Sequence, residues 1–345
     1  MRTLNLRTGT GESRILIGES IANLHDYADI GKAVIITDAT VKKLHGGKFP
    51  KAPVIEIGLG EGNKTLDTVQ KIYRRFAELE IERGSTVIGI GGGIVTDVAG
   101  FAASTYMRGV DFGFVPTTLV AQADAAIGGK NGVNLDGYKN LVGTIRQPRF
   151  VICDFELLRT LPKREMSCGF SEIIKHAAIA DAQFFAYLEE NVQNAMGFKK
   201  TAIEKAVHDA LAVKAGIVSE DESEKGGRMK LNFGHTVGHA IEKCVGLPHG
   251  EAVSIGMMVA AGISQKRGIL AQKDVERLEA VLKQAGLPTS MPKGKAGAAQ
   301  LLDAVKRDKK RKSGSIMMSL LSGIGKAQVS EVGINELEGI LNDIC

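Results

Sequence analysis

The stretch TVIGIGGGIVTDVAGFAAST, residues 86–105, predicts how the first half of this chain folds. Thr86–Ile90 is a short apolar run with β-branched residues, which favours a buried strand. Three glycines follow at 91–93, and Ile94–Ser104 then repeats apolar and small residues at helical spacing. Where a strand enters a helix through glycines, backbone N–H groups can approach a pyrophosphate at the positive end of the helix.

This glycine turn departs from the dinucleotide-binding fingerprint GxGxxG. After Gly89 and Gly91 the fingerprint requires a third glycine at position 94, and that position holds Ile94. The motif alone is therefore a weak signal for a nucleotide. The alternative interpretation is a tight turn that needs glycine for a positive φ.

The residues on both sides of this turn extend the same alternation of strands and helices. Helical spacing over Lys64–Leu79 lies between short strand-like runs, which we predict at Ala33–Thr37, Val54–Ile57, Thr86–Ile90, Gly113–Pro116 and Phe150–Cys153. The pattern predicts a mainly parallel, Rossmann-like sheet with crossover helices over residues 1–155, an α/β domain.

From residue 156 the sequence becomes mostly helical. Helices are predicted over Ser171–Glu190, Thr201–Glu220, Lys230–Cys244, Glu251–Lys266 and Gln272–Ala285. One strand is predicted at Ser315–Leu321, and Pro292–Gln300 is predicted to be a flexible connector. We therefore expect a second, helical domain over 156–345, with the active site in the cleft between the two domains.

The composition excludes several classes of protein. A formal charge of +5 spread over 345 residues, with no tryptophan, argues against nucleic-acid binding. No apolar stretch approaches the roughly 20 residues that span a bilayer, and the first residues lack the apolar core of a secretory signal. The four cysteines form no CxxC pair, which is typical of a reduced cytoplasmic protein.

Charged and polar residues interrupt several segments that are otherwise apolar. The stretch 105–140 holds Arg108, Thr117, Thr118, Asp124, Lys130, Lys139 and Asn140 among small residues. Lys214 lies on the apolar stripe of a helix, and Glu172 and Lys175 stand three residues apart in another. The alternative interpretations are a snorkelling lysine and a surface ion pair.

Three of the seven histidines lie within the segment LNFGHTVGHAIEKCVGLPHGEAV, residues 231–253. His235 and His239 share a helix face, and His249 follows a Gly-Leu-Pro break that should end this helix. A zinc-protease helix would have a glutamate after the first histidine, where this chain has Thr236. A catalytic zinc site commonly takes two histidines and a carboxylate, for which Glu172, Asp181, Glu242 and Glu251 are candidates.

Taken together, these segments resemble the 3-dehydroquinate synthase family. The resemblance covers roughly residues 55–325, through Gly60-Glu61, GGGIVTDVAGFAASTYMRG, VPTTLVAQADAAIGGKNGVN, KNLVG, LPKREMSCGFSEIIKH, RMKLNFGHTVGHAIE, HGEAV and RDKK in that order. The chain departs from the family pattern at Thr96, where glycine is usual, and at Asn131, where threonine is usual. Neither departure removes a charged residue that the family uses.

The resemblance implies an NAD site in the first domain and a metal site in the second. It assigns to NAD the residues Glu61, Lys64, Gly92, Gly93, Asp97, Thr117, Thr118, Lys130, Lys139 and Thr160. It assigns to the metal, zinc or alternatively cobalt, the residues Glu172, His235 and His249. His239 would then face the substrate and bind no metal.

The resemblance also implies the residues that hold the substrate, a phosphorylated sugar acid. The phosphate would contact Lys130, Asn140, Lys175, Asn232 and His239. Arg108 would reach the phosphate of the neighbouring subunit's substrate, which implies a homodimer. Lys214 and Arg228 would hold the carboxylate, Asp124 and Glu224 would lie near the hydroxyls, and Lys309 or Lys310 would approach the substrate.

The implied reaction converts 3-deoxy-D-arabino-heptulosonate 7-phosphate to 3-dehydroquinate and phosphate, a step of the shikimate pathway. Transient oxidation by NAD acidifies a C–H bond, phosphate leaves, the hydride returns, and an intramolecular aldol step closes the carbocycle. Lysines and amides suit the phosphate, whereas a guanidinium suits the carboxylate. A divalent metal lowers the pKa of the hydroxyl to be oxidised.

Three alternatives follow from the same residues. A metal-dependent alcohol or glycerol dehydrogenase would share the glycine turn but would accumulate NADH. A sister sugar phosphate cyclase would make an amino-dehydroquinate or a cyclitol, although cyclitol precursors lack the carboxylate that Lys214 and Arg228 would hold. A catalytically dead binding protein is disfavoured because every expected charged position is filled.

Overall fold

The computed structural model describes residues 1–292, 294–308 and 314–344. The chain forms two compact units, Met1–Pro162 and Lys163–Cys345. The division falls after Pro162 and not after the predicted residue 155, because the short helix η7 (Phe155–Thr160) packs within the first unit. Its Leu157 joins the sheet core, and the Asp154 carboxylate before it accepts a hydrogen bond from the Ile21 backbone N–H at 3.0 Å.

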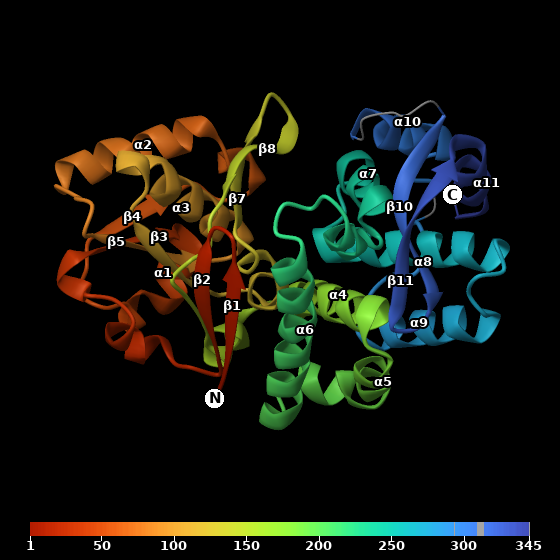
Figure 1. Ribbon diagram of the computed structural model, residues 1–345, viewed down its shortest axis with the longest axis horizontal. Coiled ribbons are helices and arrows are strands. Elements are labelled where there is room, and N and C mark those ends of the chain that lie inside the picture. Colours follow the sequence, from red (N-terminus) through yellow and green to blue (C-terminus); the bar gives the residue numbers. More distant parts are fainter. Residues whose placement is uncertain (293, 309–313, 345) are drawn as a thin grey trace. The chain divides into compact units, whose positions relative to one another are not determined.

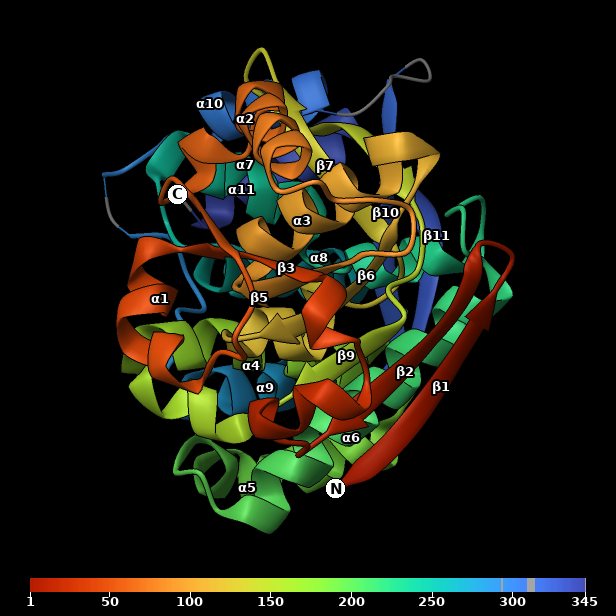
Figure 2. The ribbon, with the colours of Figure 1, turned by 90° about the vertical axis from the view of Figure 1, so that its left-hand side faces the viewer.

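The first unit is built on a seven-stranded sheet with the order β1-β2-β9-β6-β5-β3-β4 (Figures 1 and 2). Its strands are β1 (Arg2–Thr8), β2 (Gly11–Ile17), β3 (Ala33–Asp38), β4 (Val54–Ile57), β5 (Thr86–Gly91), β6 (Asp111–Pro116) and β9 (Phe150–Cys153). All neighbouring pairs are parallel except the hairpin β1–β2. The predicted mainly parallel sheet is confirmed.

Two hairpins of this unit were not predicted. Most side chains of β1 are exposed to solvent, so this strand lacks the apolar run by which the central strands are recognised. The hairpin β7 (Lys130–Leu135) and β8 (Tyr138–Ile145) forms a separate two-stranded sheet. Its sequence is rich in glycine, asparagine and lysine, residues that are uncommon in strands.

Three helices connect the strands of the first unit: α1 (Ala39–His45), α2 (Leu66–Glu78) and α3 (Gly93–Thr105). Helix α3 packs against β5 and β6. A Cβ atom at Gly89 of β5 would lie 3.1 Å from the Ala99 side chain, so glycine allows this close approach. Shorter turns of helix are η1 (Ile21–Asp26), η2 (Ile30–Lys32), η3 (Gly46–Lys48), η4 (Glu61–Asn63), η5 (Tyr106–Arg108) and η6 (Ala121–Ala125).

The second unit is mostly helical (Figure 1). Its helices are α4 (Lys163–Ala180), α5 (Ala182–Met196), α6 (Lys200–Glu220), α7 (His235–Val245), α8 (His249–Lys266), α9 (Gln272–Gln284), α10 (Ala298–Asp308) and α11 (Ile334–Ile344). The short helix η8 (Gly227–Asn232) precedes α7, and β10 (Ser315–Gly323) pairs with β11 (Lys326–Gly333) in an antiparallel hairpin.

Two of the predicted helices differ from the observed helices by more than two residues. The single helix predicted over 171–190 is wrong, because Asp181 ends α4 and caps α5 by accepting hydrogen bonds from the Gln183 and Phe184 N–H groups. The helix predicted from Lys230 begins at His235, since Gly234 has a φ of +81°. Part of the predicted connector 292–300 is helical, because α10 begins at Ala298.

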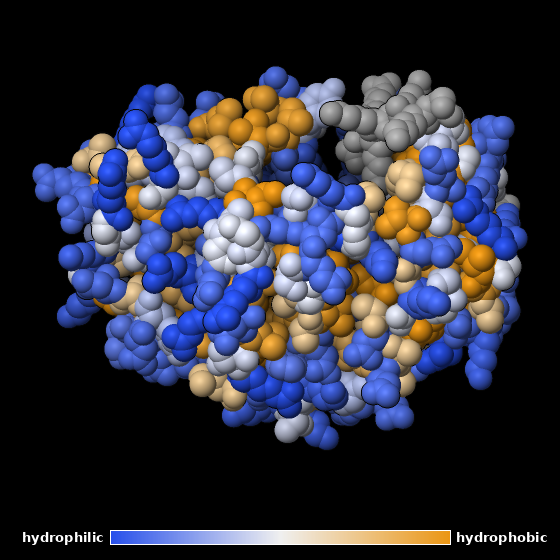
Figure 3. All heavy atoms as spheres, in the orientation of Figure 1, coloured by the Kyte–Doolittle hydropathy of each residue, from blue (hydrophilic) through white to orange (hydrophobic). Residues whose placement is uncertain are grey.

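The surface shown in Figure 3 mixes hydrophilic and hydrophobic residues, with a hydrophobic area near the tip of the hairpin β7–β8. That hairpin exposes the large apolar side chains of Leu141 and Ile145. Within the described ranges, no helix combines the length and apolar character that crossing a membrane requires.

Candidate functional site

The glycine turn of the first unit leaves space at the start of α3. Gly92 is the N-cap residue with a φ of −75°, and no side chain caps the helix. A Cβ atom at Gly92 would lie 3.1 Å from the Thr118 Cγ2 atom, and one at Gly93 would lie 3.4 Å from the Ala125 Cβ atom. The positive-φ interpretation is therefore wrong for Gly92. The glycines there keep side chains away from the uncapped N–H groups, as a bound phosphate requires.

Thr117 and Thr118 border this turn. The Thr117 N–H donates to the Gly91 carbonyl at 2.9 Å, and the Thr118 hydroxyl accepts from the Ala121 N–H at 3.2 Å. Both residues follow β6, and the turn follows β5, so they meet at the carboxyl ends of neighbouring parallel strands. Ligands of open parallel sheets bind at this edge.

Lys64 is the centre of a polar cluster in the same unit. Its side chain is buried, and its Nζ atom lies 2.5 Å from the Asp97 Oδ2 atom and 2.5 Å from the Asn140 Oδ1 atom. Asn134, which the sequence did not single out, donates to the Glu61 carboxylate and accepts from the Asn140 N–H, both at 2.8 Å. Asn140, expected at the substrate phosphate, is thus grouped with three residues expected at the cofactor.

The other predicted residues of this unit are more dispersed. The Thr160 hydroxyl lies 3.0 Å from the Nε2 atom of His45, a residue whose burial lowers the pKa of its imidazole. Lys130 and Lys139 are exposed on the hairpin β7–β8, and Asp124 is half-buried in η6. Arg108 is exposed and has a φ of +67°.

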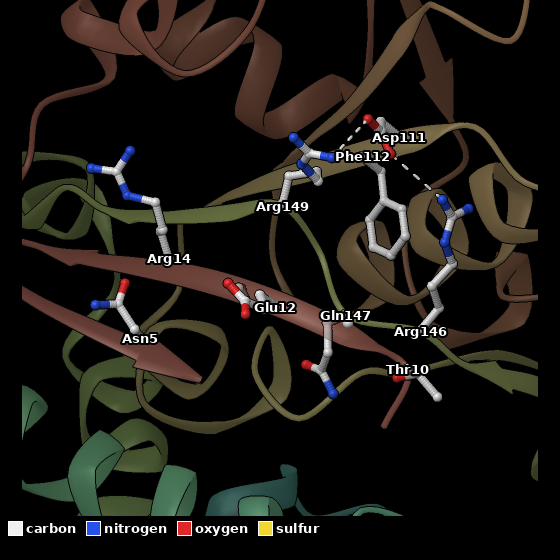
Figure 4. Close-up of a pocket in the computed structure, with 11 residues that line it drawn as sticks. Asn5, Thr10, Glu12, Arg14, Asp111, Phe112, Arg146, Gln147 and Arg149 are labelled. Carbon is white, nitrogen blue, oxygen red and sulfur yellow. Dashed lines mark ion pairs between the residues drawn. The ribbon is translucent and has the colours of Figure 1, made fainter. Parts of the chain in front are cut away.

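A polar pocket of about 520 Å³ lies elsewhere in this unit (Figure 4). It is lined by the hairpin β1–β2 and by residues at the amino ends of β6 and β9, the sheet edge opposite the glycine turn. Arg146 and Arg149 point toward Asp111, at 3.6 and 3.4 Å. The lining contains none of the predicted site residues, so this pocket is not the candidate site.

In the second unit, glycines let α8 approach both α4 and α7. A Cβ atom at Gly250 would collide with the backbone of Cys168 on α4, and one at Gly256 would collide with the backbone of Gly234. A Cβ atom at Gly238 on α7 would lie 3.1 Å from the Ala252 carbonyl oxygen. These contacts bring the first residue of α8, His249, toward α4 and α7.

Glu172 of α4, His235 of α7 and His249 of α8 meet at this junction. The Glu172 Oε1 atom lies 3.2 Å from the His249 Nε2 atom and 3.7 Å from the His235 Nε2 atom. One ligand atom from each of the three residues lies within 4.8 Å of the others. Bonds of about 2 Å in a tetrahedral zinc site place neighbouring ligand atoms about 3.3 Å apart, so these residues fit a divalent cation.

The electrostatics of the two histidines differ. Burial, together with the positive charge of Lys175, holds the pKa of His235 well below its ordinary value. Burial also lowers the pKa of His249, but hydrogen bonds to Glu172 and Glu242 outweigh it and raise this pKa to about 9. The carboxylates on both sides of His249 thus favour the protonated form of this ring, whereas the surroundings of His235 favour its neutral form.

The structure distinguishes between the four candidate carboxylates. Asp181 caps α5, and Glu251 forms a bidentate pair with Arg164 at 2.5 and 2.8 Å. Glu242 lies 3.5 Å from the Nδ1 atom of His249, on the ring edge away from Glu172. Glu172 is the carboxylate that faces the Nε2 atoms of both histidines.

A buried lysine contacts this cluster, and two further predicted cations of this unit are also buried. The Lys175 Nζ atom lies 2.5 Å from the Glu172 Oε2 atom, and both side chains are at most 2% exposed. The surface-pair interpretation is therefore wrong. Lys214 on α6 and Arg228 on η8 are 6% and 3% exposed, which also excludes a snorkelling Lys214. The elements α4, α6 and η8 contact one another.

Three more of the predicted residues are described: Asn232 lies on η8, His239 on α7 and Glu224 in the loop before η8. The His239 ring centroid is 5.4 Å from that of His235, and the Asn232 amide donates to Glu224 at 2.6 Å. Lys309 and Lys310 lie outside the described residues.

Sequence reasoning missed two polar residues of this unit. Asp221 accepts hydrogen bonds from the Lys225, Gly226 and Arg228 N–H groups, which lowers the pKa of its carboxyl and shapes the loop that carries Arg228. The available signal in the sequence was that Asp221 lies five residues before the glycine pair Gly226-Gly227.

His176, the residue after Lys175, is fully buried. Only its position in an apolar helix could have indicated this burial from the sequence.

Two family models match the chain. The model described as 3-dehydroquinate synthase N-terminal matches residues 54–168, and the model described as 3-dehydroquinate synthase C-terminal matches residues 169–311. The 3-dehydroquinate synthase of Desulforamulus reducens is 40% identical over 309 residues, which cover 86% of each chain.

Solved structures of related cyclases are also similar. A 2-deoxy-scyllo-inosose synthase complexed with carbaglucose-6-phosphate, NAD+ and Co2+ has a TM-score of 0.91 at 28% identity. The match covers 100% of this chain and 100% of that synthase. The 2-epi-5-epi-valiolone synthase ValA from Streptomyces hygroscopicus subsp. jinggangensis, with NAD+ and Zn2+ bound, has a TM-score of 0.87 at 27% identity, with 100% of this chain and 99% of ValA covered.

Proposed function

The chain belongs to the 3-dehydroquinate synthase family, and we propose that it converts 3-deoxy-D-arabino-heptulosonate 7-phosphate to 3-dehydroquinate and phosphate. In this proposal it is a phosphate-eliminating lyase of the shikimate pathway. NAD is regenerated in each turnover, and the metal is zinc or cobalt.

One observation carries the proposal further than family membership. The cluster of Glu172, His235 and His249 is bordered by a buried lysine, Lys175, whose Nζ atom lies 2.5 Å from the Glu172 carboxylate. A dehydrogenase that oxidises a neutral alcohol needs the metal ligands but has no use for a buried cation beside them. A phosphorylated substrate uses both, because Glu172, which pairs with Lys175, would also share its single negative charge with a divalent cation, and a phosphate would compensate for the excess positive charge.

In this proposal NAD binds to the first unit and the divalent metal binds to the second. When bound, NAD would supply a hydride acceptor and donor, and a divalent cation would polarise the substrate hydroxyls. In the first unit the uncapped N–H groups at Gly92 and Gly93, with Thr117 and Thr118, would hold the pyrophosphate of NAD. Lys64, Asp97, Asn140 and Glu61 form one hydrogen-bonded network, which would hold the adenosine side.

The residues of the second unit would bind and orient the substrate. Lys214 and Arg228 are buried cations on elements that contact each other, and they would hold the substrate carboxylate. Lys175, His239 and Asn232 would donate hydrogen bonds to the phosphate, together with Lys130 of the first unit. Asp124 and Glu224 would accept hydrogen bonds from hydroxyls. Fixing both charged ends of the substrate in this way aligns the carbon to be oxidised.

Arg108 is proposed to act across a homodimer interface. It is exposed at a turn where both Met107 and Arg108 have a positive φ, at +49° and +67°. This backbone conformation costs energy in residues other than glycine, and such strain is typical of functional turns. The proposal is that this turn presents the guanidinium to the phosphate of the neighbouring subunit's substrate.

A comparison of three substrates tests the proposed function against two alternatives, a cyclitol-forming cyclase and a dehydrogenase. Purified protein with NAD and Zn2+ is incubated separately with the heptulosonate phosphate, with glucose 6-phosphate and with glycerol, and released phosphate and NADH are measured. We expect phosphate release from the heptulosonate phosphate alone. Phosphate from glucose 6-phosphate would favour a cyclitol-forming cyclase, and NADH from glycerol would favour a dehydrogenase. Folded, metal-loaded protein that releases no phosphate would contradict the proposal.

A further inference from the structure

Glu242 lies next to the metal-site residue His249 but on the side of the ring that faces away from Glu172. It lies seven residues after His235 on α7, so the two side chains share a helix face. The chain turns back after α7, which ends at Val245 and is followed by Gly246 with a φ of +75°. This reversal places His249, the first residue of α8, beside the last turn of α7.

The His249 ring lies between two carboxylates. Its Nε2 atom is 3.2 Å from the Glu172 Oε1 atom, and its Nδ1 atom is 3.5 Å from the Glu242 Oε2 atom. A neutral imidazole has one N–H and one free nitrogen, so an acceptor at Nδ1 leaves Nε2 free for a metal. Glu242 therefore faces the nitrogen that the metal does not use.

His235 has a matching arrangement, with a different acceptor. Its Nδ1 atom lies 3.2 Å from the backbone carbonyl oxygen of Phe233, and its Nε2 atom faces Glu172 at 3.7 Å. Both histidines thus turn Nε2 toward the same carboxylate and Nδ1 toward an acceptor. The acceptor for His235 is a neutral backbone group, whereas that for His249 is a side chain with a negative charge.

We infer that Glu242 is a positioning residue for the metal site, which fixes the ring orientation and tautomer of His249 without binding the metal. The inference rests on the metal site of the proposed function. Partners of this kind hold histidine ligands in many metal sites, and their loss typically weakens metal binding by about 10- to 100-fold. The carboxylate also adds a negative charge near the cation.

Metal binding alone tests this role, with neither NAD nor substrate present. Apo-protein is titrated with Co2+ and followed by its visible absorption, and the Zn2+ affinity is measured by competition with a chelator. Glu242→Ala removes the acceptor, and Glu242→Gln keeps an amide oxygen that can still accept from the Nδ1–H group. Glu251→Gln is the matched control, since Glu251 lies two residues from His249 and pairs with Arg164. Circular dichroism checks that each variant is folded.

We expect Glu242→Ala to bind Co2+ and Zn2+ about 10- to 100-fold more weakly than the unaltered protein, with the absorption spectrum of the saturated Co2+ site preserved. Glu242→Gln should fall between the two, and Glu251→Gln should bind normally. Unchanged affinity in folded Glu242→Ala would overturn the inference. The inference would also be overturned if Glu242→Ala changed the Co2+ spectrum and weakened metal binding as much as His249→Ala does. That result would show that Glu242 is itself a ligand. The titration does not depend on the proposed reaction, whose own failure would show only as absent phosphate release.

Discussion

At the scale of single residues, Glu172 and Lys175 show how the helical unit keeps charges where helices would normally bury apolar side chains. Both are buried, and their charged atoms lie 2.5 Å apart. Either charge left alone in this environment would cost several kcal/mol. The two residues therefore depend on each other, and the carboxylate keeps its second oxygen directed toward His249 and His235.

The histidines provide the sharpest test at this scale. We expect His249→Ala to lose bound metal and His239→Ala to keep it, although both variants lose turnover. The reason is that the His249 Nε2 atom faces Glu172, whereas His239 is not part of the three-residue cluster. Metal content after dialysis, read by elemental analysis, checks both variants. If His239→Ala loses the metal instead, the ligand assignment is wrong.

A pH-dependent contribution to stability is expected in the first unit. The Tyr27 hydroxyl donates to Glu19 at 2.7 Å; this hydrogen bond lowers the pKa of Glu19 below its ordinary 4.5 and raises that of Tyr27 to about 12. A lowered acid pKa contributes stability above pH 4.5 that is lost as the pH falls through the folded value. A raised tyrosine pKa contributes stability below pH 10 that is lost as the pH rises toward 12.

Tyr27→Phe tests this contribution. Between pH 5 and pH 9 the variant should be less stable by about 1 kcal/mol, a typical value for one hydrogen bond. The difference should shrink below pH 4.5, where Glu19 becomes protonated in the unfolded and then in the folded state. Thermal unfolding at a series of pH values measures it. A difference that stays constant down to pH 3 would exclude the ionised Glu19 as its cause.

At the scale of elements, the metal cluster depends on the close packing of α8 against α4. Gly250→Ala places a methyl group on the backbone of Cys168, so α8 must move away from α4. We expect weaker metal binding and a lower melting temperature. Gly262→Ala on the same helix is the control, because a Cβ atom there meets nothing within 4 Å. That control should be stabilised by up to about 1 kcal/mol. Normal metal affinity in Gly250→Ala would show that this packing does not set the site.

The elements also show how much of the fold the sequence could predict. Strands such as β4, and helices such as α6 and α9, were predicted within about two residues, because their periodicity is strong and burial reinforces it. The hairpin β1–β2 and α11 were missed. The first strand exposes most of its side chains, so it has no apolar run. Whether a residue is buried depends on partners distant in the sequence, and a local pattern does not contain this information.

The candidate site was predictable in part for a related physical reason. Charged residues on apolar helix faces indicated Lys175, Lys214 and Glu172, because burying a charge without a function is unfavourable. The choice of Glu172 over Glu242, Asp181 and Glu251 required the fold. Local sequence could not tell that Glu251 pairs with Arg164 or that Glu242 faces the Nδ1 atom of His249. Asn134 was missed because its two hydrogen bonds join residues far apart in the chain.

At the scale of the whole molecule, the boundary between the units follows from packing. The sequence change at residue 156 is real, but η7 still buries Leu157 in the core of the first unit, so the division falls after Pro162. A change in composition marks where helices begin, whereas a unit ends where its contacts end.

The proposed homodimer makes a prediction about mixtures of inactive subunits. Arg108→Ala and Lys214→Met should each abolish turnover. If Arg108 acts in the neighbouring subunit, a heterodimer of the two variants holds one intact site. Random co-assembly should then restore about a quarter of the normal activity, since half of the dimers are mixed. Co-expression with two affinity tags and an assay of the mixed pool checks this. No recovery in a purified heterodimer would place Arg108 in its own subunit's site.

The most direct test of the central claim is the product balance of a single reaction. Purified protein is mixed with NAD, Zn2+ and 3-deoxy-D-arabino-heptulosonate 7-phosphate, and phosphate, 3-dehydroquinate and NADH are measured over time. The proposed function predicts phosphate and 3-dehydroquinate in equal amounts with no net NADH, and none of these products in His249→Ala. Accumulation of NADH in step with substrate loss, or phosphate without 3-dehydroquinate, would contradict it.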